Sequence, residues 1–171
     1  HISGGGRCNF TNMHCGPQAF LSQNPHFAKS ALARYTQWDF IELVDRHGIA
    51  WHEKTLGQLF CDSSAKEIIA MLRGLMQKAG VDLQLQSSAS NFAKVDGHIT
   101  FDLQTPDRTV KVTACNLVIA TGGKSIPKMG ATGIAYDIAR QFGLNVTDTR
   151  AALVPFTFAE GRLRRWPARR P

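Results

Sequence analysis

Apolar residues recur at helical spacing over residues 64–79, and this is the clearest helix that the sequence predicts. Ser64 and Glu67 form a capping box at its start, and Gly80 follows its end. The apolar positions are Ile68, Leu72, Leu75 and Met76. We therefore expect a helix that packs one apolar face against a core.

Weaker signals predict three more helices. They cover residues 24–32, 36–47 and 132–142. The first opens with Asn24 and Pro25 as N-cap and first helical residue, because proline's missing N–H costs nothing in a first turn. The other two end before Gly48 and Gly143, since glycine is favoured just beyond a helix.

Strands are expected where short apolar or alternating runs are bounded by turn residues. These are residues 49–51, 58–60, 81–85, 89–95, 98–104 and 108–113, with a last short strand beginning near Leu144. Asp96-Gly97 predicts a two-residue hairpin turn. Residues 117–120 form an unbroken apolar run, which predicts a strand buried on both faces. Together the elements indicate a mixed α/β domain of the nucleotide-binding type.

Composition narrows the class of protein. The chain has 171 residues, of which 43% are hydrophobic, so it is neither disordered nor collagen-like. No run approaches the roughly 20 apolar residues that a membrane span needs, and no signal-peptide pattern opens the chain. We expect a cytoplasmic protein without a membrane partner. Its four cysteines form no CxxC pair, so we expect no metal site.

The formal net charge of +7 is concentrated at one end of the chain. Residues 161–171 hold five arginines and no acid, which leaves 15 basic and 13 acidic residues over residues 1–160. Such a tail can bind phosphate backbones. An alternative function is therefore a non-catalytic nucleotide- or nucleic-acid-binding module that uses this tail. A solvated tail or vector-encoded sequence explains it as well, and the near-neutral remainder argues against a nucleic-acid partner.

Glycine-rich strings supply the candidate chemistry. Residues 4–9, GGGRCN, combine a backbone that tolerates close approach with polar side chains, although a flexible turn is an alternative. Residues 120–123, ATGG, follow the predicted buried strand, where ligands bind in open α/β sheets; a tight turn would explain the two glycines alone. Residues 130–133, GATG, open a helix whose N-terminus attracts anions, or which merely has an ordinary threonine cap.

The order of these strings resembles one family. SGGGRCNFTN, WHEKTLGQLF, VIATGGKSIPKMGATGIAYDIARQFGLNV and ALVPF resemble bacterial FAD-dependent flavoproteins of the aminoacetone-oxidase-like, YhiN type, which are NAD(P)/FAD-dependent oxidoreductases. The resemblance covers about residues 2–158. It implies a partial two-dinucleotide-binding, Rossmann-like FAD domain over residues 1–158, with an antiparallel β-meander, and without the first βαβ strand or the substrate domain. Residues 159–171 would form an arginine-rich tail outside the family.

The resemblance also implies a cofactor and a site. FAD would transfer hydride or electrons to or from a small-molecule substrate in the full-length protein, with NAD(P)H as a candidate electron partner, whereas the isolated chain is expected to be inactive. No catalytic acid or base can be named. The residues expected to contact FAD are Gly4, Gly5, Gly6, Arg7, Cys8, Asn9, Asn12, Ala89, Ala120, Thr121, Gly122, Gly123, Gly130, Thr132 and Gly133.

Overall fold

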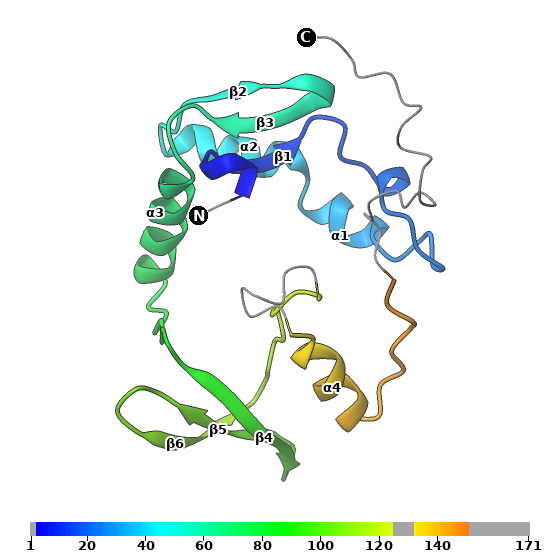
Figure 1. The fold of residues 1–171 in the computed structure, drawn as a ribbon, viewed down its shortest axis with the longest axis vertical. Coiled ribbons are helices and arrows are strands. Elements are labelled where there is room, and N and C mark those ends of the chain that lie inside the picture. The colour runs from blue at the N-terminus through cyan, green and yellow to red at the C-terminus, as the bar shows by residue number, and fades with distance from the viewer. Residues whose placement is uncertain (1–2, 125–131, 151–171) are drawn as a thin grey trace, which may run out of the picture. The chain divides into compact units, whose positions relative to one another are not determined.

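The computed structural model describes residues 3–124 and 132–150, and the chain divides into two compact units, His1–Leu83 and Gln84–Pro171 (Figure 1). Gly130, the ALVPF string and the arginine-rich tail lie outside the described residues. Within the described ranges, no helix is long and apolar enough to cross a membrane.

The first unit is built on a small antiparallel sheet with strand order β1-β3-β2. The strands are β1 (Asn9–Asn12), β2 (Trp51–Glu53) and β3 (Gln58–Cys61), and the helices are α1 (Lys29–Arg34), α2 (Gln37–Arg46) and α3 (Ala65–Lys78). A register shift between Asn9 and Thr11 bulges β1 against β3. In Figure 1, α2 runs alongside this sheet.

The core of this unit lies where the sheet meets α2 and α3. Val44, Leu59 and Cys61 are fully buried. Ile68 of α3 joins them, as its helical spacing predicts. Because all these positions come from one apolar face of each element, burying them ties the sheet to both helices.

Local helix signals are confirmed for α2 and α3. Both helices carry complete capping boxes, from Thr36 to Asp39 and from Ser64 to Glu67. The carboxylate of Asp39 accepts from the backbone N–H of Thr36 at 2.6 Å, and its hydrogen bonds with Thr36 lower the pKa of Asp39. Glycines follow both helices in the left-handed region, as expected for C-terminal stops.

The helix predicted from residue 24 begins five residues later, at Lys29. The Asn24 side chain accepts from the backbone N–H of His26 at 3.0 Å, and the N–H of Phe27 bonds the Asn24 carbonyl at 3.1 Å. Residues 25–28 therefore form a turn. The prediction was wrong because an asparagine side chain that bonds its own backbone offers an alternative to the helix.

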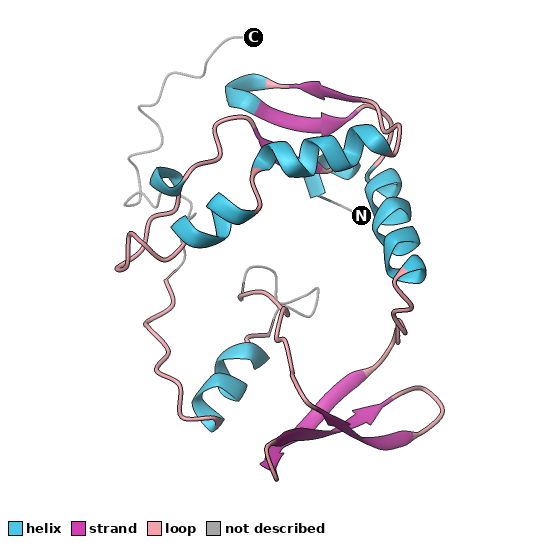
Figure 2. Cartoon of the chain, turned by 180° about the vertical axis from the view of Figure 1, so that it is seen from behind, coloured by secondary structure: helices cyan, strands magenta, loops and turns pink. Residues whose placement is uncertain are grey.

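The second unit contains an antiparallel meander of β4 (Ser88–Val95), β5 (His98–Gln104) and β6 (Thr109–Ala114), followed by α4 (Ile134–Gln141) (Figure 2). Asp96 and Gly97 both have positive φ, so the predicted two-residue hairpin is confirmed. Phe92 and Phe101 stack at 5.5 Å, and the Gln141 side chain of α4 donates to the Phe92 carbonyl. These contacts join α4 to the meander.

Three predicted strands are wrong, namely those at residues 81–85, at 117–120 and near 144. In the first stretch, the Leu85 side chain is 68% exposed. In the second, the Val118 side chain is 85% exposed, so residues 117–120 are not buried on both faces. All three stretches lie outside the strands of the described residues, because an apolar composition alone does not make a strand. All strand pairs in the described ranges are antiparallel.

Candidate functional site

The glycine string at the start of the first unit forms a left-handed turn. Gly4, Gly5 and Gly6 have φ values of +57°, +66° and +89°. No atom lies within 4 Å of the place where a Cβ would stand on Gly5 or on Gly6. The Arg7 carbonyl accepts from the N–H of Cys61 at 3.0 Å, which fastens the turn to β3. The result is an anchored loop whose middle glycines are open to close approach.

Gly4 has a different role from its two neighbours. A Cβ on Gly4 would lie 2.7 Å from the backbone nitrogen of Asn9 and 2.7 Å from Cε1 of Phe60. Both distances are too short for real contacts. Gly4 therefore allows the chain to pack closely against β1 and β3, and this close packing holds the loop in position.

The two asparagines of the site use their side chains inside the protein. The Asn12 amide donates to the Leu56 carbonyl at 2.9 Å and accepts from the N–H of His14 at 2.7 Å. The Asn9 amide nitrogen, in the orientation that satisfies its hydrogen bonds, faces the carbonyls of Thr11 and Leu59. Both side chains brace the β1 and β3 region, so they position the loop.

Arg7 and Cys8 complete this string. Arg7 is exposed, and no carboxylate in the described part of the chain pairs with its guanidinium. Cys8 has a φ of +55° and packs against the core that contains Cys61. Burial, with a smaller effect from Cys8, raises the pKa of the Cys61 thiol to about 11. Cys61 is thus a protonated core residue, while Arg7 offers a positive charge that is unpaired among the described residues and lies next to the open glycines in the chain.

The second and third strings come together in the second unit. A Cβ on Gly123 would lie 2.9 Å from the Tyr136 hydroxyl, and a Cβ on Gly133 would lie 2.5 Å from Cε of Lys124. The ammonium of Lys124 lies 5.9 Å from the centre of the Tyr136 ring. The sequence analysis did not identify Lys124 or Tyr136 as site residues, because no pattern in the neighbouring sequence indicates which side chain will pack over a glycine elsewhere in the fold.

The start of α4 is not capped by Thr132, which is the alternative that the sequence allows. Its N-cap is Gly133, which has a φ of +88° and makes no side-chain cap, and Thr132 is exposed one residue earlier. Ala120, Thr121 and Gly122 are exposed too. Gly122 has a φ of +73° with open space beyond its Cα, like Gly5 and Gly6.

Two other features of this unit bear on the predicted site. Ala89 lies in β4 opposite Leu103, and its contact with a cofactor stays a prediction. An apolar cavity of about 350 Å³ lies between β5, residues 117–119 and α4. Leu117 and Ile119 line this cavity, whereas Val118 is exposed to solvent. Only one side of the apolar run therefore packs against the rest of the unit.

These features fit a dinucleotide cofactor. In the first unit, Gly5 and Gly6 have left-handed backbone, no side chain and free space, which allows a phosphate to approach the main chain. Gly122 of the second unit has the same three features. The positive charge of Arg7 complements a pyrophosphate. In the described residues, no group of three or more metal-ligating side chains occurs.

A family comparison agrees with this chemistry. The model of the HI0933-like protein Rossmann domain matches residues 1–158. The chain belongs to this family. An HI0933-like Rossmann domain is an α/β domain of the dinucleotide-binding class, which confirms the predicted fold class and supports a dinucleotide cofactor. The narrower likeness to aminoacetone oxidases is not established by this match.

Proteins whose names state an activity are also similar to this chain. The Ribosomal RNA dihydrouridine synthase of Escherichia coli (strain K12) is 59% identical over 156 residues, covering 91% of the chain and 38% of that protein. The enzyme of the same name from Haemophilus influenzae is 51% identical, covering 93% and 40%. A 3-dehydro-bile acid delta(4,6)-reductase from Clostridium scindens is 24% identical, covering 93% and 40%. The chain thus spans about two-fifths of the length of each relative.

Proposed function

We propose that the complete gene product containing residues 1–171 is an FAD-dependent reductase that converts uridine in ribosomal RNA to dihydrouridine. The observation that carries this proposal is the 59% identity, over 91% of the chain, to an enzyme of that name. The proposal favours a cytoplasmic RNA substrate over the small molecule that the sequence predicts, and reduction over oxidation of the aminoacetone-oxidase type.

The reaction needs a two-electron donor. Uridine becomes dihydrouridine when the C5–C6 double bond of uracil gains a hydride at one carbon and a proton at the other. Reduced FAD supplies a hydride when it is bound, and NAD(P)H is the candidate that restores it. The name of the distant bile acid relative also describes a reduction. The proposed conversion of uridine to dihydrouridine is a reduction of the same general type.

The chain's own residues would hold and orient the cofactor. In the first unit, Gly5 and Gly6 would admit a phosphate to the main chain, and Arg7 would neutralise its charge. In the second unit, Gly122 would allow the same kind of approach. The start of α4 at Gly133 adds backbone N–H groups and the positive end of a helix dipole. Asn9 and Asn12 would act by bracing the first loop.

Flavin binding by the complete gene product tests the cofactor. We expect the purified protein to show a flavin spectrum and to release FAD on denaturation. Gly5→Ala should weaken FAD binding about 5- to 150-fold, since a methyl group forced into a close contact costs about 1–3 kcal/mol. Gly48→Ala is the matched control, because Gly48 has nearly the same φ, +64° against +66°, and the same open space. Equal FAD affinities for the two variants would contradict the assignment of the loop.

Nucleoside analysis tests the reaction. Ribosomal RNA from a strain that lacks the gene should contain less dihydrouridine by mass spectrometry, and the gene supplied in trans should restore it. An unchanged dihydrouridine content, or a complete protein that binds no FAD after reconstitution, would refute the proposed function.

A further inference from the structure

An exposed aromatic stretch in the first unit plays no part in the site described above. We define it as the aromatic–basic segment, residues 16–38. Its exposed apolar side chains are Phe20 (47%), Leu21 (94%), Phe27 (82%), Tyr35 (54%) and Trp38 (53%). Single exposed apolar residues are ordinary, whereas five within one segment are the kind of concentration that an interaction surface requires.

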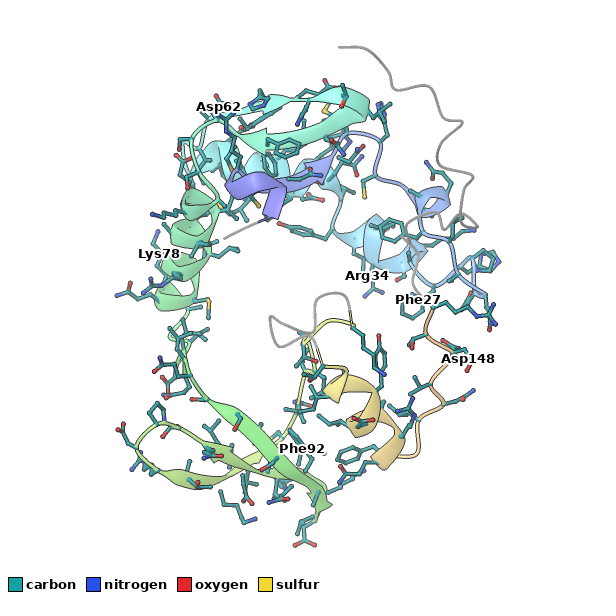
Figure 3. All side chains as sticks on the ribbon, viewed as in Figure 1. Phe27, Arg34, Asp62, Lys78, Phe92 and Asp148 are labelled. Carbon is teal, nitrogen blue, oxygen red and sulfur yellow. The ribbon has the colours of Figure 1, made fainter. Side chains whose placement is uncertain are left out.

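The segment carries positive charge and no negative charge. The whole stretch from residue 1 to residue 38 contains no aspartate or glutamate. Lys29 and Arg34 lie at the two ends of α1, and both are exposed. Neither forms an ion pair with a carboxylate in the ranges that the structure describes. In Figure 3, Phe27 and Arg34 are both seen beside α1.

Hydrogen bonds hold this backbone in place although its side chains are exposed. The N–H of Phe20 bonds the Pro17 carbonyl at 3.2 Å, and two bonds to Asn24 shape the turn that carries Phe27. At the base, the side-chain amide of Gln37 donates to the Met13 carbonyl at 3.1 Å. The aromatic rings thus stand on an ordered scaffold, which lowers the entropy lost when a ligand binds them.

We propose that the aromatic–basic segment binds unpaired RNA. Bases would stack on Phe20, Phe27 and Tyr35, and phosphates would pair with Lys29 and Arg34. Aromatic rings interleaved with cations are the means by which proteins hold unstacked bases, and the segment contributes no carboxylate of its own to repel the phosphates. The neighbouring Asp39 carboxylate is bound to the backbone N–H and the hydroxyl of Thr36. This inference rests on the proposed function and assigns the surface through which that enzyme holds its RNA.

Binding of a fluorescently labelled, single-stranded uridine-rich RNA to the complete gene product tests the surface. Phe27→Ala should weaken binding about 5- to 150-fold, the range expected for one lost base–aromatic stack. Phe27→Trp should retain it. Arg34→Gln should lower the slope of log affinity against log salt by about 0.7, as for one phosphate contact on a single strand.

Matched controls come from α3 of the same unit. Leu72→Ala removes an apolar side chain that is 42% exposed, and Arg73→Gln makes the same charge change as Arg34→Gln. Both controls should bind the RNA as the parent protein does. If Phe27→Ala binds RNA as tightly as Leu72→Ala, the inference is wrong. A Phe27→Ala protein with a lowered melting temperature and unchanged RNA affinity would also overturn it, and would show that the rest of the polypeptide covers this face.

The two proposals fail in different ways. A parent protein that holds FAD and supports dihydrouridine formation, with no loss of RNA affinity in Phe27→Ala, would refute the RNA surface alone. A parent protein without FAD, or without effect on dihydrouridine, would refute the proposed function whatever its RNA affinity. Flavin content measured in each variant separates a damaged cofactor site from a lost RNA contact.

Discussion

Replacing Gly4 by alanine tests whether the glycine string is divided between support and ligand approach. The new methyl group would stand 2.7 Å from the Asn9 nitrogen and from Cε1 of Phe60. The Phe60 ring cannot easily withdraw, because it is buried and stacks on His52 at 6.3 Å. The Asn9 nitrogen belongs to the backbone of β1. Gly4→Ala must therefore shift the loop or the edge of the sheet.

The expected cost has two parts. A non-glycine residue in the left-handed region costs about 1–2 kcal/mol. An added methyl group in a packed region costs about 1–3 kcal/mol more. Gly48→Ala carries only the first part, because its φ is +64° and no atom lies within 4 Å of its Cβ position. Gly4→Ala should therefore lower the free energy of unfolding by about 1–3 kcal/mol more than Gly48→Ala does.

Urea unfolding followed by circular dichroism on the complete gene product measures this difference, with Gly5→Ala as a third variant. Gly5→Ala should match Gly48→Ala in stability, since it too has open space. If all three variants unfold at the same urea concentration with the same slope, the close approach of Gly4 to β1 and Phe60 does not govern stability, and the division of roles is refuted.

Three further predictions concern titratable groups. Iodoacetamide at neutral pH should label the exposed Cys115 and spare the buried Cys61 in the folded protein, by peptide mass spectrometry, and equal labelling would contradict the core assignment. Because the pKa of Cys61 is raised from 9.0 to about 11, stability should fall as the pH rises through that interval. The hydrogen bonds from Asn91 and Lys111 hold the pKa of Asp102 below 3.8. The contribution of Asp102 to folding stability is therefore present above pH 3.8 and is lost as the pH falls through the lowered pKa. Asp102→Asn should therefore show a smaller acid-induced loss of stability than the parent, while Asp107→Asn should behave like the parent.

Local signals in the sequence were sufficient to predict elements whose hydrogen bonds join residues close together in the chain. The capping boxes at Thr36 and Ser64 predicted the starts of α2 and α3, and Asp96-Gly97 predicted the hairpin. Each signal acts between residues only a few positions apart, so no distant partner is needed. The turn at Asn24 shows the limit of this reasoning, since its side chain could cap a helix or form a turn and the sequence does not decide between them.

Strand formation depended on residues that lie far away in the sequence. The apolar runs at 81–85 and 117–120 have the composition of strands, yet a strand exists only where another segment supplies its hydrogen bonds.

The sequence by itself determined the two longest helices, the hairpin and the positions of the glycine strings. Only the tertiary structure separated Gly4 from Gly5, committed Asn12 to the Leu56 carbonyl and placed Tyr136 against Gly123. The physical reason is that a glycine's role depends on which atoms approach it, and those atoms come from chain segments that the local sequence does not specify.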